Sequence, residues 1–239
     1  IQNPEIKIIT IEDPIEYHLE GISQTQAEPE KGYDFSEGLR SIVRQDPDVM
    51  LVGEIRDLET AKIALQASLT GHLVFTTLHT NDAAGAIPRL IDLGANPSSI
   101  APSLKTVIAQ RLIRIVCKEC SSYAKPKSEE MTEIKRGLKN LPKEVDVPKD
   151  LNKIKIAKAK EGGCKKCNFS GYNGRKGIFE LFLVGAKMEK LILSNPPVSE
   201  IKEAAVKNGM VTIYQSGLIE VVFGETTLAE VRRTVEEDS

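Results

Sequence analysis

Four cysteines form two matched pairs, Cys117-x2-Cys120 and Cys164-x2-Cys167, and the sequence contains no others. Two such pairs supply four thiolates that can converge on one tetrahedral centre, as in a closed structural zinc site. A closed site has no open coordination position, so we expect the metal to stabilise the fold and to take no part in catalysis. Two alternatives are disulfides and four unrelated buried thiols.

Polar side chains that can act on a phosphate group stand at the ends of three apolar, strand-like segments. Glu12, Asp13 and Glu16 follow the first segment, Glu54 follows the second, and His72 and His79 flank the third. A carboxylate at a strand end can hold Mg²⁺, usually through water, and a neutral histidine can donate to a phosphate oxygen. The alternatives are a solvated acidic turn and histidines that are packed or exposed.

Three arginines, Arg40, Arg44 and Arg56, lie close to the same segments in the sequence. A guanidinium group there can neutralise the charge that develops on a transferred phosphoryl group. The alternative is a solvated arginine on a helix face.

The elements that must position these residues alternate between strand and helix. We expect strands at 7–12, 49–53 and 72–78, helices at 35–44, 58–69 and 82–92, and a further helix from 97 to about 112. Strands separated by helices need crossover connections, which favours an α/β fold with a mostly parallel sheet. Ligands of such folds bind at the carboxyl ends of the strands.

Beyond residue 116 the sequence becomes rich in lysine and glycine, which indicates a separate subdomain. We expect three parts: a partial α/β core at 1–116, a four-cysteine subdomain at 117–176, and a C-terminal strand and helical subdomain at 177–239. A helix is expected at 131–138 within the second part. The third part is expected to contain a strand at 177–184 and helices at 187–194, 198–207, 212–222 and 227–235.

The bulk composition limits the classes of function. The chain has 239 residues, a net charge of -2 and 28% charged residues, the balance of a folded globular protein. No apolar run approaches the roughly 18 residues that a membrane span needs. Nucleic acid is not expected as a partner, although a zinc-ribbon module that binds nucleic acid or protein without catalysis is the alternative function.

The order of the motifs resembles the ATPases that drive type II secretion and type IV pilus assembly. The resemblance rests on "ITIEDPIEY", on "GLRSIVRQDPDVMLVGEIRDLETAKIALQASLTGHLVFTTLHTNDA", on the paired cysteines and on "GYNGRKGIFEL". In that family the first segments are the aspartate box, the Walker B segment and the histidine box. The resemblance therefore implies a RecA-like P-loop NTPase core that works as a homo-hexamer with ATP and Mg²⁺.

The resemblance also implies roles for individual residues. Glu12 would be the general base that polarises the attacking water, supported by Asp13 and Glu16, and Glu54 would be the Walker B acid near Mg²⁺. His72 and His79 would contact the γ-phosphate, and Arg40, Arg44 and Arg56 would be charge partners of the nucleotide. Paired cysteines favour an assembly or secretion motor, which implies a cytoplasmic protein at the inner face of the inner membrane. Its partners would be an inner-membrane platform protein and a cytoplasmic adaptor.

One motif of the family is not in this sequence. The phosphate-binding loop G-x-x-x-x-G-K-[ST], expected a few tens of residues before "ITIEDP", does not occur in residues 1–239. Its backbone N–H groups and its lysine bind the β- and γ-phosphates. We therefore expect the chain to be a C-terminal piece of such an ATPase, inactive by itself, with activity only in an intact parent.

Overall fold

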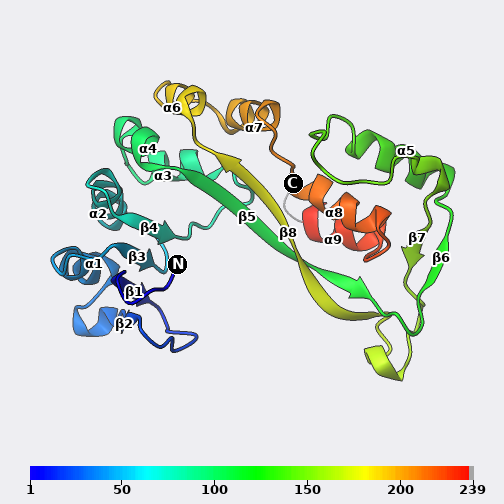
Figure 1. The fold of residues 1–239 in the computed structure, drawn as a ribbon, viewed down its shortest axis with the longest axis horizontal. Coiled ribbons are helices and arrows are strands. Elements are labelled where there is room, and N and C mark those ends of the chain that lie inside the picture. Colours follow the sequence, from blue (N-terminus) through cyan, green and yellow to red (C-terminus); the bar gives the residue numbers. More distant parts are fainter. Residues whose placement is uncertain (237–239) are drawn as a thin grey trace. The chain divides into compact units, whose positions relative to one another are not determined.

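The computed structural model describes residues 1–236, which fall into two compact units. The first unit contains residues 1–80, 84–107 and 183–204, and the second contains residues 81–83, 108–182 and the chain from 205 onward. Figure 1 shows the course of the chain and the labels of its elements. The division into three parts at 116 and 176 stays a prediction.

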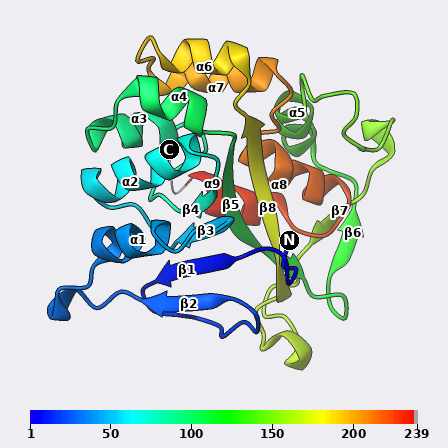
Figure 2. The same cartoon turned by 60° about the vertical axis from the view of Figure 1, so that its left-hand side comes forward.

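The first unit is built on a four-stranded parallel sheet whose strand order is β2-β1-β3-β4. Its strands are β1 (Ile8–Glu12), β2 (Ser23–Gln26), β3 (Val49–Val52) and β4 (Leu73–Thr76). Its helices are α1 (Phe35–Val43), α2 (Leu58–Leu69), α3 (Ala86–Asp92), α4 (Pro97–Ser103), α6 (Ala186–Ile192) and most of α7 (Val198–Lys207), with a short 3-10 turn at Pro29–Lys31. Because the strands are parallel, their carboxyl ends meet at one edge (Figure 2).

Aspartates fix the starts of the two helices that follow this edge. Asp34 accepts a hydrogen bond from the Glu37 backbone N–H at 2.9 Å, and Asp57 accepts one from the Thr60 N–H at 2.8 Å. Each bond satisfies an N–H that has no partner inside its helix. The caps therefore set where α1 and α2 begin.

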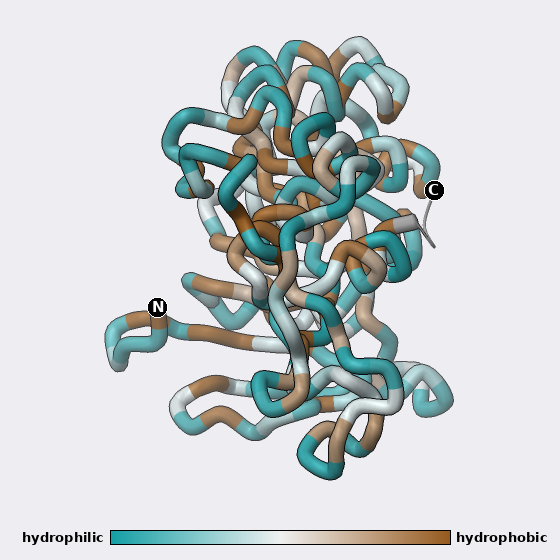
Figure 3. The backbone as a smooth tube through the Cα atoms, turned by 90° about the vertical axis from the view of Figure 1, so that its right-hand side faces the viewer, coloured by the Kyte–Doolittle hydropathy of each residue, from teal (hydrophilic) through white to brown (hydrophobic). Residues whose placement is uncertain are grey.

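Apolar side chains of β1, β3, α1 and α2 form the core of the first unit. Ile11, Leu39 and Met50 are fully buried, as is Ala61 of α2. The apolar run of β1 is visible in Figure 3 as the brown stretch that follows the N-terminal turn. Burial of such runs on a parallel sheet is the main driving force for this layered packing.

Several sequence-based predictions are confirmed here. The strands at 7–12 and 49–53 and the helices at 35–44 and 58–69 match β1, β3, α1 and α2 to within one residue at each end. The helix expected from residue 82 begins only at Ala86, and residues 81–83 belong to the second unit. Strand β2 was not predicted, because its sequence "SQTQ" has no apolar alternation.

The second unit contains a long two-stranded ribbon, a small two-stranded sheet and helices. Its strands are β5 (Thr106–Val116), β6 (Ser122–Ala124), β7 (Ile156–Lys158) and β8 (Tyr172–Leu183). Its helices are α5 (Ser128–Gly137), α8 (Ile213–Val222) and α9 (Leu228–Glu236), with 3-10 turns at Leu151–Lys153 and Lys165–Cys167. β5 pairs with β8, and the two run in opposite directions (Figure 1). The expected helices of the C-terminal part are confirmed in α6, α7, α8 and α9.

The prediction of a helix from 97 to about 112 is wrong. The observed helix α4 ends at Ser103, and Thr106–Val116 forms strand β5. Side chains alternate in exposure from Thr106 to Ile113, with Val107 and Ile113 buried and Ile108 and Leu112 exposed. That period of two belongs to a strand with one buried face. The strand expected at 177–184 likewise begins earlier, at Tyr172.

A buried carboxylate, Glu230 of α9, ties the ribbon to the last helix. Its oxygens accept hydrogen bonds from the Arg114 backbone N–H at 2.9 Å and from the Arg114 and Arg233 guanidinium groups. Arg114 also stacks on the Tyr172 ring, 4.3 Å from its centroid. Burial alone raises the pKa of Glu230, but the bonds from Arg233 and Arg114 outweigh it and lower the pKa to about 2.

The low pKa of Glu230 makes a pH dependence of stability testable. A carboxyl group whose pKa is lower in the folded than in the unfolded chain stabilises the fold fully when the pH is above its unfolded-state pKa. This stabilisation is lost as the pH falls toward the folded-state pKa of about 2. We expect Glu230→Gln to lower the free energy of unfolding by about 3 kcal/mol at pH 7 and to flatten the pH dependence between about pH 5 and pH 2. Urea unfolding across that range measures both effects. Glu200→Gln is the control, because Glu200 is an exposed residue of α7. An equal loss of stability in both variants would contradict the role assigned to Glu230.

Within the part of the chain that the structure describes, no helix combines the length and the apolar character needed to cross a membrane.

Candidate functional site

The carboxyl edge of the sheet brings together side chains from three parallel strands. Glu12 ends β1, Glu54 follows β3, and His79 follows β4. Beyond the strands, Gly53 N–H donates to Ile11 O at 2.8 Å and Ile55 N–H donates to Thr77 O at 3.1 Å. These bonds continue the sheet for one or two residues and so place Glu54 beside His79.

Glu54, Arg56 and His79 form a hydrogen-bonded group, the Glu54 cluster. Glu54 Oε2 lies 2.9 Å from His79 Nε2, and Glu54 Oε1 accepts a bond from the Arg56 guanidinium. The Glu54 side chain is only 12% exposed, whereas the His79 side chain is 84% exposed. The carboxylate is therefore held inside the edge of the sheet while its partners face outward.

The charges in the Glu54 cluster shift each other's pKa. The Arg56 hydrogen bond lowers the pKa of Glu54, burial opposes this, and the His79 bond adds to the lowering. The same bond to Glu54 raises the pKa of Arg56, to which the nearby charge of Asp13 also contributes. Glu54 is therefore ionised at neutral pH, and Asp13 lies within electrostatic reach of the cluster.

Glu12 is positioned by two neighbours that sequence reasoning did not identify. Thr10 Oγ1 donates to Glu12 Oε1 at 2.5 Å, and Gln24 Nε2 donates to the same oxygen at 3.0 Å. Gln24 lies on β2, so the unpredicted strand supplies part of the site. Neither bond uses Oε2. Asp13 and Glu16 follow in an exposed turn that begins with a cis peptide bond between Asp13 and Pro14.

Three of the predicted nucleotide-binding residues make their hydrogen bonds and ion pairs with residues outside the Glu54 cluster. Arg40 of α1 pairs with Glu37 at 3.2 Å and with Glu59. Arg44 ends α1, and its Nε donates to Arg40 O at 3.2 Å. His72 precedes β4, with its Nδ1 2.9 Å from Ala67 O.

The position of Arg44 and His72 follows from the direction of the strands. Asp48, just before β3, accepts a hydrogen bond from the Leu73 N–H at 3.1 Å, so the starts of β3 and β4 share the amino edge of the sheet. Arg44 and His72 belong to that edge. His72 and His79 therefore lie at opposite ends of β4, and the structure does not bring them together.

The four cysteines meet at one point in the second unit. Their sulfur atoms all lie within 4.8 Å of one another, and none of them forms a disulfide. Three separations are 3.8 Å (Cys117–Cys164), 3.9 Å (Cys120–Cys167) and 3.8 Å (Cys164–Cys167). Four sulfurs at about 2.3 Å from a tetrahedral Zn²⁺ are about 3.8 Å apart. The cluster thus has the donor set and the dimensions of a zinc site.

Backbone geometry around the second pair also suits thiolates. The N–H groups of Cys164 and Gly171 point at Cys167 Sγ at 3.1 and 3.3 Å. Burial raises the pKa of Cys167, but these donors outweigh it and lower the pKa to about 6. Gly163 has φ +50°, and a side chain there would lie 2.7 Å from Cys167 Sγ. Only glycine fits at that position.

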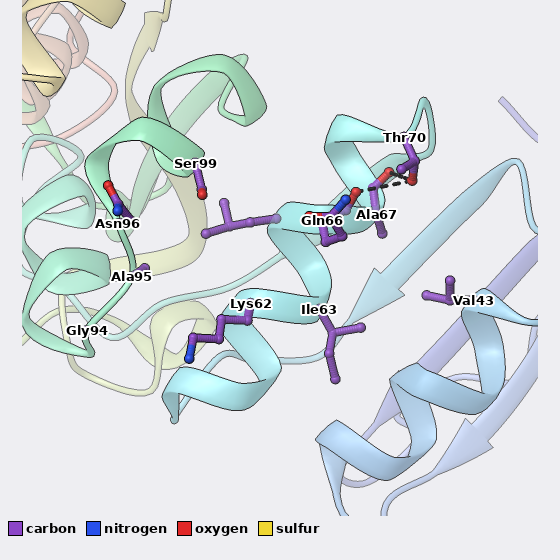
Figure 4. A pocket seen from close by; sticks show the side chains of 11 residues that line it. Val43, Lys62, Ile63, Gln66, Ala67, Thr70, Gly94, Ala95, Asn96 and Ser99 are labelled. Atoms are coloured by element: carbon purple, nitrogen blue, oxygen red, sulfur yellow. Dashed lines mark hydrogen bonds between the residues drawn. The ribbon is translucent and has the colours of Figure 1, made fainter.

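A hollow of about 730 Å³ lies on the first unit, between α2, the end of α1 and the start of α4 (Figure 4). It is lined by Val43, Lys62, Ile63, Leu65, Gln66, Ala67, Thr70, Gly94, Ala95, Asn96 and Ser99. None of these residues belongs to the Glu54 cluster, so the hollow is separate from the polar edge.

A parallel α/β sheet with acidic and histidine side chains at its carboxyl edge, together with a four-cysteine site, defines a RecA-like protein with an added metal-binding part. The chain belongs to the family of type II/IV secretion system proteins, whose model matches residues 1–233. It is 44% identical to the type IV pilus assembly ATPase PilB of Thermus thermophilus over 99% of this chain and 25% of that protein. It is also 44% identical to the type II secretion system ATPase E of Vibrio cholerae, over 99% of this chain and 44% of that protein. The chain thus spans less than half the length of these relatives.

Solved structures agree on the fold. The pilus retraction motor PilT with bound ADP has a TM-score of 0.63 and 27% identity, over 98% of this chain and 52% of that one. The ATPase DotB of Legionella pneumophila has a TM-score of 0.62, over 95% of this chain and 51% of that one; at 20% identity this likeness concerns the fold alone. The RecA-like fold class expected from the sequence is confirmed.

Proposed function

We propose that this chain supplies the hydrolytic strand ends of an ATP-driven motor for type IV pilus assembly or type II secretion. The observation that carries the proposal is the Glu54 cluster beside Glu12 at the carboxyl edge of the sheet. The names of the 44% identical relatives, a pilus assembly ATPase and a secretion ATPase, support it. In such a motor, hydrolysis would drive the extrusion of pilin or pseudopilin subunits.

Glu12 is proposed as the general base. Thr10 and Gln24 hold Oε1, which orients the carboxylate and leaves Oε2 to accept a proton from the attacking water. Asp13 and Glu16, in the exposed turn that follows, are proposed to support this role, and the charge of Asp13 acts on Arg56.

Glu54 is proposed to hold Mg²⁺ through water, since its ionised carboxylate is a hard oxygen donor of the kind that this ion prefers. When bound with ATP, Mg²⁺ would neutralise charge on the phosphates. His79 Nε2 bonds to Glu54 and is proposed to donate to a phosphate oxygen or to water once the nucleotide occupies the edge. Arg56 is the nearest guanidinium to offset the developing negative charge.

His72, Arg40 and Arg44 stay predictions as nucleotide-binding residues. Arg44 and His72 lie at the amino edge of the sheet, so we propose that any contact they make is with a nucleotide held by a neighbouring subunit of a homo-hexamer. The four cysteines are proposed to bind a structural Zn²⁺ ion, because all four ligand positions are filled by thiolates.

The remaining partners are also proposals. We propose a cytoplasmic location at the inner face of the inner membrane, with a membrane platform protein and a cytoplasmic adaptor as partners. Lys165, Lys166 and Arg175 are exposed around the cysteine site and provide a basic surface for the platform. Reversing these three charges should weaken platform binding while the zinc content stays constant.

ATP hydrolysis by two forms of the protein tests the proposal. We expect the 239-residue chain to show neither tight ATP binding nor Mg²⁺-dependent turnover, because its sequence contains no phosphate-binding loop. A longer form that carries the loop should hydrolyse ATP with Mg²⁺. Turnover by residues 1–239 would contradict the first expectation, and an inactive longer form that binds ATP would contradict the proposed function.

A further inference from the structure

Gln24 of β2 lies opposite Thr10 of β1, because the two strands pair in parallel with these residues as partners (Figure 2). Thr10 and Glu12 are two positions apart on β1, so their side chains share one face of the sheet. Gln24 reaches the Glu12 carboxylate from the neighbouring strand, where its Nε2 donates to Oε1 at 3.0 Å. These three residues all belong to the first unit.

The Gln24 side chain also holds the loop between β1 and β2, residues 13–22. Its Nε2 donates a second hydrogen bond, to Tyr17 O at 3.0 Å, and its Oε1 accepts one from the Leu19 N–H at 2.6 Å. A single amide thus binds the loop and the Glu12 carboxylate at the same time. An ionised glutamate has no donor and a lysine or arginine has no acceptor, so the arrangement is specific to an amide.

The Gln24 amide is fixed in one orientation by these three bonds. A flipped amide would place its oxygen against Glu12 Oε1 and Tyr17 O, and its nitrogen against the Leu19 N–H, so every contact would be repulsive. Two of the three partners belong to the loop. A loop that moves away from Gln24 therefore removes most of what holds the amide toward Glu12.

The middle of the loop depends on Gln24 for its position. The side chains of Tyr17 and Leu19 are exposed, so packing does not hold these residues. The Gln2 side chain donates to Glu20 O and holds the end of the loop that precedes β2. A short exposed segment with few buried contacts opens at low free-energy cost.

We infer that Gln24 is a positioning residue that couples residues 17–19 of the loop to Glu12. Glu12 keeps both of its side-chain donors, Thr10 and Gln24, while the loop is bound to Gln24, and it loses the second donor when the loop opens. The relevance to hydrolysis rests on the proposed function, whereas the coupling is a property of the folded chain.

NMR of the 239-residue chain tests the coupling from both sides. Gln24→Met keeps the length of the side chain and removes all three bonds. We expect amide exchange at Leu19 to become at least about tenfold faster in this variant, as loss of a hydrogen bond predicts, and the Glu12 carboxyl ¹³C signal to move. Leu19→Pro removes only the backbone N–H that donates to Gln24. It should move the Gln24 side-chain amide signals and shift the Glu12 signal toward its position in Gln24→Met.

Leu19→Ala is the matched control, because it shortens the same exposed side chain and keeps the N–H. It should leave the Gln24 and Glu12 signals in place. Unmoved Gln24 and Glu12 signals in folded Leu19→Pro would overturn the inference. If Leu19→Pro does not fold, Gln24→Met decides alone: it must change both the Glu12 signal and the exchange at Leu19, and a change in only one or in neither would overturn the coupling.

A longer form that carries the phosphate-binding loop separates the coupling from the proposed function. We expect Gln24→Met to lower kcat about tenfold with little change in KM for ATP, because a misoriented base slows the chemical step. Normal kcat in Gln24→Met beside an inactive Glu12→Gln would overturn the positioning role. Normal kcat in Glu12→Gln would contradict the proposed function instead, and it would leave the NMR result as it stands.

Discussion

Replacing Cys167 with serine is expected to release the metal and to unfold much of the second unit. A hydroxyl is a far weaker zinc ligand than a thiolate, and binding of a structural metal is itself folding free energy. We expect the zinc content to fall from one ion per chain to nearly none, and the free energy of unfolding to fall by more than about 4 kcal/mol. Elemental analysis and urea unfolding followed by circular dichroism measure the two effects.

Lys166→Ser is the matched control for this variant, since Lys166 is an exposed residue of the same short turn. It should keep both zinc and stability. A chelator should reproduce the effect of Cys167→Ser on the wild-type chain, and added Zn²⁺ should reverse it. A Cys167→Ser chain that keeps its zinc and its stability would rule out the four-thiolate site.

Glu54→Gln in a longer form that carries the phosphate-binding loop is expected to lower kcat by about 100-fold or more, with little change in KM for ATP. The amide keeps the shape of the carboxylate, but it removes the charge that holds Arg56 and His79 and that would position Mg²⁺. Steady-state ATP hydrolysis at saturating Mg²⁺ measures the change.

Glu200→Gln controls for the loss of an acidic group from the same unit. Glu200 is an exposed residue of α7 and is not one of the proposed site residues. It should hydrolyse ATP at the wild-type rate. A Glu54→Gln variant with normal kcat would show that the carboxylate at the end of β3 has no part in the reaction.

Local sequence signals were enough for elements whose apolar pattern lies within a few residues. The helices at 35–44 and 58–69 were predicted from such local patterns, and the structure adds the Asp34 and Asp57 caps at their starts. The spacing of the two cysteine pairs was enough to predict that the four thiols come together. Residues 106–112 were misassigned to a helix because the structure of this segment depends on a distant strand, β8. A short run such as "TVIAQRLIRIV" is compatible with a helix until its pairing partner is known.

Prediction of the site was limited in the same way by contacts between segments that are distant in the sequence. The parallel strands predicted that Glu12, Glu54 and His79 share one edge of the sheet, and the structure places them there. The bond between Glu54 and His79 depends on β3 and β4 being neighbours, which sequence order did not establish. His72 could have been placed at the opposite edge, since it precedes its strand. Gln24 gave no signal, because β2 is polar and short.

The long insert between the two cysteine pairs has an evolutionary consequence. Both pairs are held where β5 ends and β8 begins, and the Cys117 N–H bonds to Gly171 O at 2.9 Å. The metal centre thus closes a large loop, and closure entropy rises only slowly with loop length, by about 0.6 kcal/mol for each doubling. Insertions and deletions in the stretch between α5 and β7 are therefore nearly neutral for the ribbon. Homologues can diverge in length there while they keep the spacing inside each cysteine pair.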